Sequence, residues 1–251
     1  MLYTHPMHDF FLINDHLRLE GAIFYPSHKK DRYPAILFVH GWTGERKSSF
    51  QYAKSLADSG YVCLLFDLRG HGTSQGDRNN FSSKDFLSDV VAAYDYLSKI
   101  KDVDPENISA VGSSFGGYLV ALLSGKRKVR NLVLRAPAEY QNETFNMLKK
   151  IISGKDPNIM KWRTRERKPT ETYALEALRG FMGSVLLIES EKDDSIPHQT
   201  VLNYKNAVRD KSKLTHVLMK DAPHSIKEGK FRDKVERILV KWFEGRLSSS
   251  P

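Results

Sequence analysis

A serine flanked by glycines lies between two apolar runs, in the stretch Gly112-Ser113-Ser114-Phe115-Gly116. Residues 108–111 before it have the character of a buried strand, and residues 117–123 after it have that of a buried helix. A G-x-S-x-G element in this setting predicts a sharp strand-to-helix turn with the serine at its apex. Neighbouring backbone passes close to such a turn, so the positions two before and two after the serine must be small. Both are glycine when Ser114 is the centre, whereas centring on Ser113 would place a valine and a phenylalanine there.

This turn would give Ser114 the properties of a nucleophile. Its hydroxyl would be held exposed at the end of a sheet. The helix that follows would direct its first N–H groups toward the place where negative charge develops in acyl transfer. The alternative for this serine is a structural role in a tight turn.

Runs of strand character alternate with helical runs through most of the chain. Strands are expected at 8–14, 17–26, 34–39, 61–68, 108–111, 131–136, 185–189 and 215–219. Helices are expected at 50–59, 83–100, 117–123, 198–208 and 231–247. Continuously apolar strands are typical of a sheet covered on both faces, and strand–helix alternation is typical of parallel pairing. The sequence thus predicts an α/β fold with a mostly parallel central sheet of about eight strands and helices on both faces.

The alternation is interrupted between residues 136 and 183, where helical stretches follow one another without a strand. We interpret residues 139–180 as a small helical cap inserted over the C-terminal edge of the sheet. Residues 1–138 and 181–251 then form one α/β core, which a chain of 251 residues is long enough to build. Some large apolar side chains of the cap could line an acyl or aryl pocket or form the cap's own core: Tyr140, Phe145, Met147, Met160 and Trp162.

The chain carries a formal net charge of +9, from 39 lysines and arginines against 30 acidic residues. Positive charge is densest between Lys149 and Lys168, and no zinc-finger, homeodomain or RNA-recognition signature accompanies it. A nucleic-acid partner is therefore not predicted. The basic stretch is either a solvated surface or a rim that attracts anionic substrates.

The sequence also bears on the compartment. No run approaches the roughly 18 apolar residues of a membrane span, and the first residues lack the basic and apolar regions of a secretory signal. The one cysteine, Cys63, lies in an apolar run and is expected to be a buried structural residue. The expectation is a cytoplasmic protein without a membrane span, of an oligomeric state that the sequence does not define.

A catalytic serine needs a base, and the base needs a group that orients it. His224 is the candidate base, because it stands in a loop just past the last predicted strand. The acid is expected in the loop 190–197, after the strand 185–189, where Asp193 and Asp194 both qualify and spacing does not separate them.

Acyl transfer also requires two N–H donors that converge on the developing oxyanion. One is expected to be the N–H of Phe115, the residue after the nucleophile. The other is expected from the loop after the strand 34–39, where Gly41 permits an unusual backbone path and Trp42 supplies the N–H. The alternative is that this loop is only a turn.

Several stretches of the sequence, taken with the chain order serine, acid, histidine, carry a family resemblance. They are Phe38-Val39-His40-Gly41-Trp42, Phe66-Asp67-Leu68-Arg69-Gly70-His71-Gly72-Thr73-Ser74, Gly112-Ser113-Ser114-Phe115-Gly116-Gly117, Glu191-Lys192-Asp193-Asp194-Ser195-Ile196-Pro197 and Ala222-Pro223-His224. Together they make the chain resemble a serine hydrolase of the α/β-hydrolase superfamily over nearly its whole length. The loop pattern and the cap length are most similar to those of bacterial cinnamoyl or feruloyl esterases and related carboxylesterases.

The resemblance implies the roles of residues that spacing leaves open. In such proteins the acid often stands four residues before the proline of a D-x-x-x-P turn, which implies Asp193 rather than Asp194. It also implies that Asp67, Arg69 and His71 are scaffold residues that take no part in the chemistry.

The sequence and the resemblance together predict an esterase that works through an acyl-enzyme, with Ser114 as nucleophile, His224 as base and Asp193 as acid. No metal and no organic cofactor is expected, and the predicted partner is a small-molecule ester of aromatic or anionic character. Thioester hydrolysis, peptide cleavage and acyl transfer use the same triad and are alternatives. A hydrolase-like binding protein is a further alternative, although no triad residue is missing.

Overall fold

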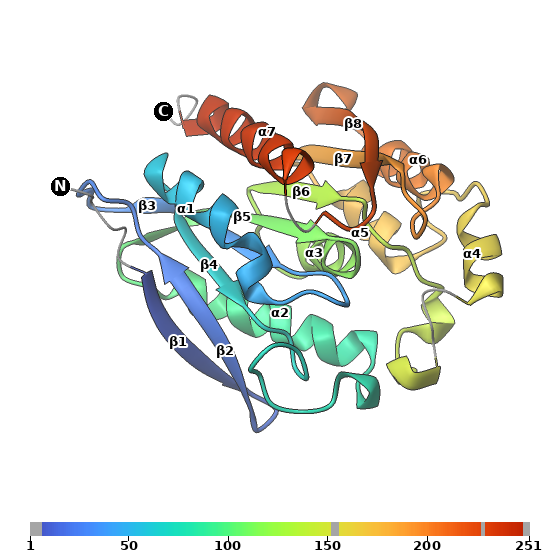
Figure 1. The fold of residues 1–251 in the computed structure, drawn as a ribbon, viewed down its shortest axis with the longest axis horizontal. Coiled ribbons are helices and arrows are strands. Elements are labelled where there is room, and N and C mark those ends of the chain that lie inside the picture. Colours follow the sequence, from blue (N-terminus) through green and yellow to red (C-terminus); the bar gives the residue numbers. More distant parts are fainter. Residues whose placement is uncertain (1–6, 152–155, 227–228, 248–251) are drawn as a thin grey trace.

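A computed structural model describes residues 7–151, 156–226 and 229–247, and within them eight strands lie in one sheet between two layers of helices (Figure 1). The strands are β1 Met7–Asn14, β2 Leu17–Phe24, β3 Tyr33–Val39, β4 Val62–Phe66, β5 Val103–Ser113, β6 Asn131–Arg135, β7 Ser184–Lys192 and β8 Leu214–Pro223. The α-helices are α1 Phe50–Asp58, α2 Ser83–Ser98, α3 Phe115–Ser124, α4 Pro157–Arg163, α5 Tyr173–Gly180, α6 His198–Ala207 and α7 Lys230–Leu247. Short 3₁₀ turns are η1 Arg46–Ser49, η2 Arg78–Asn80, η3 Asn142–Thr144, η4 Lys149–Ile151 and η5 Lys211–Lys213.

The order of strands in the sheet is β1-β2-β4-β3-β5-β6-β7-β8. Strand β2 runs antiparallel to both of its neighbours, and every pair from β4 to β8 is parallel. The prediction of a mostly parallel sheet with helices on both faces is confirmed. The chain turns from β3 to β4 on one side and then crosses to β5 on the other, so the strand order reverses between β3 and β5. Ligands of such sheets bind at the C-terminal ends of the strands where the order reverses.

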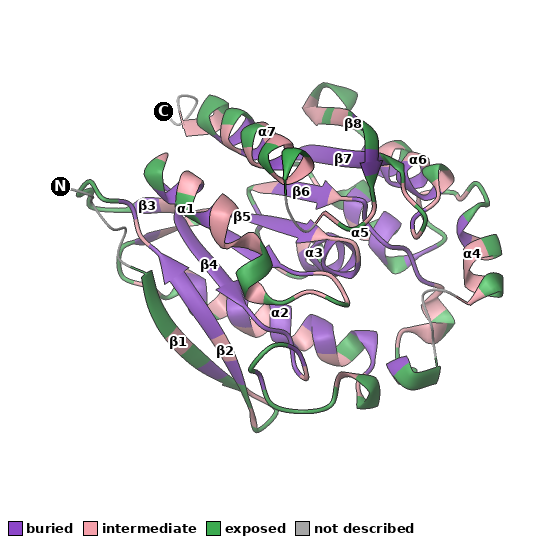
Figure 2. Ribbon diagram, in the orientation of Figure 1, coloured by how far each residue is buried: buried purple, intermediate pink, exposed green. Residues whose placement is uncertain are grey.

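Side chains of the central strands alternate between two hydrophobic cores. Leu37 of β3 belongs to one core, and its neighbours Ile36 and Phe38 belong to the other. Helices α2, α3, α5 and α6 cover the first core, and α1 and α7 cover the second. Figure 2 shows the central strands buried and the edge strand β1 largely exposed. Cys63 of β4 is fully buried, as expected.

Strand β5 is longer than the apolar pattern predicts. It begins at Val103, which pairs with Tyr33, and the register then shifts before Ala35 pairs with Ile108. The residues in between are a proline and three polar residues, and the Asp104 carboxylate accepts the N–H of Glu106 at 3.0 Å. A strand interrupted in this way carries no continuous apolar run, so the sequence reveals only its second half.

Between β6 and β7 the described residues form η3, η4, α4 and α5 and no strand. A buried carboxylate fastens this segment: Glu139 accepts hydrogen bonds from Thr172 Oγ1 at 3.2 Å and from Asn203 Nδ2 of α6 at 3.3 Å. Burial raises the pKa of Glu139. We propose that residues 139–180 are the cap insertion, with 1–138 and 181–251 as the core; residues 152–155 lie outside the described part. Helix α5 packs into the same core as α3 and anchors the end of the segment.

Candidate active site

The turn between β5 and α3 holds Ser114 in an uncommon backbone conformation. Its φ is 54° and its ψ is −116°, a region that costs free energy for a residue other than glycine. A Cβ on Gly112 would lie 2.3 Å from the carbonyl oxygen of Gly116, and one on Gly116 would lie 2.1 Å from that of Val39. The two glycines are therefore required by close contact of backbone with backbone.

A chain of hydrogen bonds runs from this serine to a carboxylate. Ser114 Oγ lies 3.1 Å from His224 Nε2, and His224 Nδ1 lies 2.8 Å from Asp193 Oδ2. The carboxylate side chain is 4% exposed and the imidazole is 17% exposed. The structure thus brings together the three residues that the sequence singled out, in the arrangement of nucleophile, base and orienting acid.

The two neighbouring aspartates of the β7–α6 loop have different surroundings. The second oxygen of Asp193 accepts the N–H groups of Ser195 at 2.9 Å and Ile196 at 2.7 Å, which fixes the carboxylate toward the histidine. Asp194 is exposed, and its carboxylate accepts the hydroxyl of Ser195 at 3.0 Å. Asp193 is therefore the partner of His224 and also caps the turn through its second oxygen, whereas Asp194 lies at the surface.

These side chains come from one edge of the sheet. Ser114 follows β5, Asp193 follows β7, and His224 follows β8, each at the C-terminal end of a parallel strand. Trp42 follows β3, the neighbour of β5 at the point where the strand order reverses. The edge is therefore the one at which doubly wound sheets bind ligands.

The loop that carries Trp42 is fixed by two buried histidines. The N–H of Leu68 donates to His40 Nε2 at 3.1 Å, so the proton of this imidazole is on Nδ1 and is donated to the carbonyl of Gly41 at 2.8 Å. Burial and the neighbouring His71 lower the pKa of His40 to about 4, which keeps it neutral. His71 Nε2 lies 2.8 Å from the carbonyl of Trp42. Both histidines thus set the path of the loop.

Trp42 and Phe115 are adjacent through their rings, which meet edge to face with centroids 5.6 Å apart. Phe115 is the first residue of α3, and N–H groups in the first turn of a helix have no carbonyl one turn earlier to bond. The backbone of Gly41 also approaches the elbow, because a Cβ there would lie 3.3 Å from the carbonyl of Ser113. The loop and the start of α3 are therefore packed against each other beside Ser114.

The scaffold residues implied by the resemblance are buried in polar networks. Arg69 pairs with Asp89 of α2 at 2.6 Å and with Asp15 at 2.8 Å. Asp67 accepts the N–H of Arg46 at 2.6 Å. None of the hydrogen bonds described for Asp67, Arg69 or His71 joins them to Ser114, Asp193 or His224, so they support the loop between β4 and α2.

Arg135, the last residue of β6, is a site residue that sequence reasoning missed. Its Nη1 donates to Ser113 Oγ at 2.9 Å, and its Nη2 donates to the carbonyl of His224. It therefore ties the elbow to the histidine loop. Burial lowers its pKa, and the charge of Asp193 opposes that shift. The signal in the sequence was a charged residue near the end of an otherwise apolar strand.

The basic stretch divides into exposed and buried members. The exposed members are Lys150, Lys161, Arg165 and Lys168. Lys149 and Arg163 are buried, and Lys155 lies outside the described residues. Lys149 Nζ lies 4.0 Å from the ring centre of Tyr140 and 4.6 Å from that of Phe115, and it has no hydrogen-bond partner among the described residues. Burial, with a contribution from the charge of Arg163, lowers the pKa of Lys149 to about 7. Cation–π contacts recover about 2 kcal/mol, against a desolvation cost of several kcal/mol for an unpaired ammonium.

The large apolar side chains of the segment 139–180 take different places. Tyr140 is buried with its ring 5.8 Å from that of Phe115, and Phe145 packs against the core. Met147 is 38% exposed, and Met160 and Trp162 are half-buried. Tyr140 is therefore the member of this set that borders the elbow.

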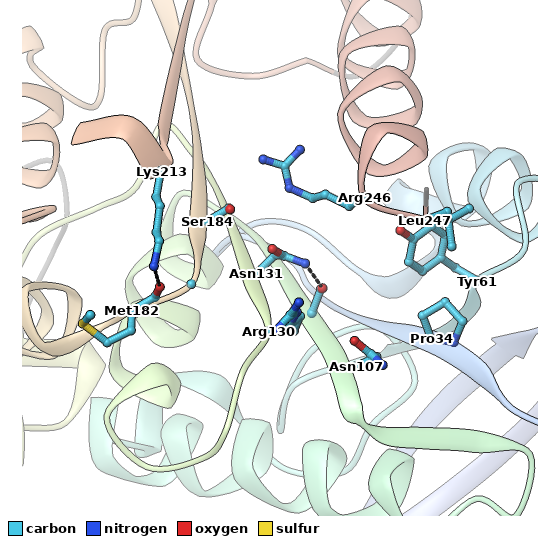
Figure 3. A pocket seen from close by; sticks show the side chains of 12 residues that line it. Pro34, Tyr61, Asn107, Arg130, Asn131, Met182, Ser184, Lys213, Arg246 and Leu247 are labelled. Carbon is cyan, nitrogen blue, oxygen red and sulfur yellow. Dashed lines mark hydrogen bonds between the residues drawn. The ribbon is translucent and has the colours of Figure 1, made fainter. Parts of the chain in front are cut away.

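A cavity of about 200 Å³ lies at the opposite edge of the sheet (Figure 3). Its lining includes the first residues of β6 and β7, and Lys213, Arg130 and Arg246 contribute three cations. Lys213 Nζ donates to the carbonyl of Met182 at 2.7 Å. Ser114, Asp193 and His224 do not line this cavity, so it is separate from the hydrogen-bonded triad.

A model of the α/β-hydrolase fold family matches residues 34–217, and the chain belongs to this family. It is 30% identical over 184 residues to an uncharacterized protein of Mycobacterium tuberculosis (strain CDC 1551 / Oshkosh), covering 73% of this chain and 60% of that protein. It is 26% identical over 160 residues to a carboxylesterase of Bacillus subtilis (strain 168), covering 60% of this chain and 64% of that protein. The structure of Est1E from Butyrivibrio proteoclasticus with ferulic acid bound superposes with a TM-score of 0.74 at 17% identity, covering 96% of this chain and 100% of that one.

The match confirms the predicted membership of the α/β-hydrolase superfamily. The chain spans less than two thirds of the length of the M. tuberculosis relative. No helix in the described part of the chain is long and apolar enough to cross a membrane. Among residues 7–151, 156–226 and 229–247, no group of three or more histidine, cysteine or acidic side chains is arranged to hold a metal ion.

Proposed function

We propose that this protein is a serine hydrolase that cleaves carboxylic esters through an acyl-enzyme, with Ser114, His224 and Asp193 as its catalytic triad. The observation that carries the proposal is the hydrogen-bond chain from Ser114 Oγ through the imidazole to a buried carboxylate, with distances of 3.1 Å and 2.8 Å. The strained backbone of Ser114 adds support, because strain of this kind concentrates at functional sites.

The proposed reaction has two acyl-transfer steps. Ser114 Oγ attacks the ester carbonyl carbon while its proton passes to His224 Nε2, and Asp193 holds the imidazole in the tautomer that can accept it. The imidazolium then donates this proton to the leaving alcohol, and the acyl-enzyme forms. Water, deprotonated by the same imidazole, attacks the acyl carbon. The bond between the acyl carbon and Ser114 Oγ then breaks, the imidazolium returns its proton to Oγ, and the acid is released.

We assign the oxyanion contacts to the backbone N–H groups of Phe115 and Trp42. The N–H of Phe115 is available because it opens α3, and the helix dipole favours negative charge at that end. Removing one such donor from a comparable site costs about 3 kcal/mol of transition-state stabilisation. The buried His40 and His71 support this assignment, since they fix the Trp42 loop through its carbonyl groups.

The proposed substrate is a small ester of aromatic or anionic character. The likeness to the B. subtilis carboxylesterase and to the ferulic-acid complex of Est1E supports the ester and the aromatic part. The lysines and arginines of residues 149–168 support the anionic part. The buried single cysteine fits the reducing cytoplasm that we propose as the compartment.

The test compares the wild-type protein with the Ser114→Ala variant on a panel of short-acyl, long-acyl and aryl esters, a thioester and an amide. The matched control is Ser124→Ala at the far end of α3, whose hydroxyl bonds only the carbonyl of Ala121 among the described residues. We expect Ser114→Ala to lose at least about 10⁴-fold in kcat on esters with an unchanged circular dichroism spectrum, and Ser124→Ala to keep its activity. Ester hydrolysis by Ser114→Ala at the wild-type rate would refute the proposal, and exclusive turnover of the thioester or amide would change the reaction assigned.

A further inference from the structure

Lys149 is held in place by its backbone. Its N–H donates to the carbonyl of Phe81 at 2.9 Å, and the preceding Leu148 pairs with Ser82 as an isolated antiparallel bridge. These contacts fix η4 against the residues that open α2. The residue is 5% exposed, so the ammonium is directed into the protein rather than into solvent.

The ammonium contacts a residue that carries one of the proposed oxyanion donors. Its Nζ lies 4.6 Å from the ring centre of Phe115, the residue after Ser114. The ring of Phe115 in turn contacts the ring of Trp42, which carries the other proposed donor. Lys149 is thus linked to both donor residues through contacts with their rings.

Among the described residues, none accepts a hydrogen bond from this ammonium. Arg163, a second cation, has its guanidinium 5.0 Å from the ring centre of Tyr140, whose ring also contacts Lys149. Glu139, the residue before Tyr140, has a buried carboxylate that is already bonded to Thr172 and Asn203. Contacts with aromatic faces replace only part of the hydration free energy that an ammonium loses on burial. The rest of that free-energy cost can be offset only by a hydrogen-bond acceptor from outside the described residues.

We propose that Lys149 is a substrate-recognition residue whose ammonium pairs with a carboxylate on the ester substrate. The inference rests on the proposed function, which supplies the ester at Ser114, and it narrows the substrate class to carboxylate-bearing esters such as half-esters of dicarboxylic acids. An uncharged acyl chain would leave the ammonium unpaired, so the site discriminates by charge.

The test measures kcat/KM on matched substrates at about pH 6.5, where Lys149 is largely protonated and a carboxylic acid is ionised. One series contains methyl half-esters of linear dicarboxylic acids of increasing length, and the other contains methyl esters of monocarboxylic acids of equal length. A second pair of series carries the carboxylate on the alcohol part. The variants are Lys149→Met, which keeps an unbranched side chain but removes the ammonium, and the control Lys150→Met, which removes the exposed lysine beside it.

We expect Lys149→Met to lower kcat/KM for the best charged ester by about tenfold or more, which corresponds to 1.4 kcal/mol. Its kcat/KM for the uncharged esters should stay within about twofold of wild type, and Lys150→Met should leave the ratio of charged to uncharged esters unchanged. An equal effect of Lys149→Met on charged and uncharged esters would overturn the inference, as would an equal drop of the ratio in Lys150→Met.

A binding measurement separates this inference from the proposed function. Isothermal titration calorimetry of the half-esters is performed with Ser114→Ala and with the double variant Ser114→Ala/Lys149→Met. Binding that is about tenfold weaker in the double variant supports charge recognition even if the wild-type protein hydrolyses no ester, in which case only the proposed reaction fails. Equal binding by both variants would overturn the role of Lys149 whether or not esters are hydrolysed.

Discussion

Asp193 and Asp194 are neighbours with identical side chains, but their carboxylates differ in burial and in hydrogen-bond partners. The first is buried, bonded to His224 at 2.8 Å and held by two backbone N–H groups. The second is exposed and bonds a hydroxyl. Sequence spacing cannot separate them, because the difference lies in where the turn directs each carboxylate.

We expect Asp193→Asn to lower kcat for ester hydrolysis by about 10³- to 10⁴-fold, because an amide at this position no longer holds the imidazole in the tautomer that accepts the serine proton. Asp194→Asn, the matched control one residue later, should stay within about threefold of wild type. Steady-state kinetics on the best ester of the panel measures both. A larger loss in Asp194→Asn would show that the acid is misassigned.

We propose that Arg135 positions the proposed triad through backbone and hydroxyl groups. Replacing it by methionine removes the fork that joins Ser113 to the carbonyl of His224. We expect Arg135→Met to lower kcat by about ten- to a hundredfold with KM within about twofold of wild type, because the histidine loop loses its alignment with the elbow. Arg135→Lys keeps one donor at this place and should lose less. Equal changes of kcat in both variants, or a rise of KM that matches the fall of kcat, would contradict a positioning role.

At the scale of elements, the turn between β5 and α3 depends on close packing of backbone against backbone, which leaves no room for a side chain at its glycines. We expect Gly116→Ala to destabilise the protein by about 3 kcal/mol or more, because its Cβ would lie 2.1 Å from the carbonyl oxygen of Val39 and no side chain can move aside. The same change at Gly245 in α7, where a Cβ would meet nothing within 4 Å, should stabilise by about 0.5–1 kcal/mol. Urea unfolding measures both, and equal effects would contradict the contact argument.

The sequence predicts elements well where one pattern decides them. Strands β3 and β4 are apolar on both faces and are identified by composition alone, because each face packs against a helix layer. The first half of β5 is not predicted from the sequence, because a register shift and polar residues interrupt its apolar pattern. The 3₁₀ turn η4 is not predicted either, because so short a segment has no periodicity. Its position depends on the pairing of Leu148 with Ser82, which is distant in the sequence.

For the molecule as a whole, the sheet topology explains how much of the site could be predicted. Parallel strands place their C-terminal ends at one edge, so the gathering of Ser114, the acid loop and His224 follows from strand–helix alternation alone. Arg135 and Lys149 depend on packing between segments far apart in the chain. From a sequence, a charged residue is expected at the surface. Only the tertiary structure shows that Lys149 is buried and that Arg135 joins the elbow to the histidine loop.

Lys149 should also give the folded protein a specific pH dependence. Its pKa is about 7 in the folded protein and about 10.5 in an unfolded chain, so between these values the unfolded state holds a proton that the folded state has lost. The free energy of unfolding therefore rises with pH from about 7 to 10.5, and below pH 7 the whole cost of burying the charge is present.

We expect Lys149→Met to exceed wild type in free energy of unfolding by several kcal/mol at about pH 6.5, and the excess to shrink as the pH approaches 10. Other groups titrate alike in both proteins and cancel in the difference, and Arg163 keeps its charge across this range. Chemical denaturation at a series of pH values provides the measurement, with Lys150→Met as control. A Lys149→Met protein less stable than wild type at every pH would mean that the ammonium is paired in solution.

The most direct test of an activated serine is reaction of the folded protein with a fluorophosphonate probe, followed by mapping of the adduct by peptide mass spectrometry. The hydrogen-bond chain through His224 to Asp193 predicts one modified residue, Ser114, with labelling abolished in His224→Ala and retained in Asp194→Asn. Labelling of another serine, or no labelling of the folded wild-type protein under conditions that label a known serine esterase, would contradict the proposal that Ser114 is the nucleophile.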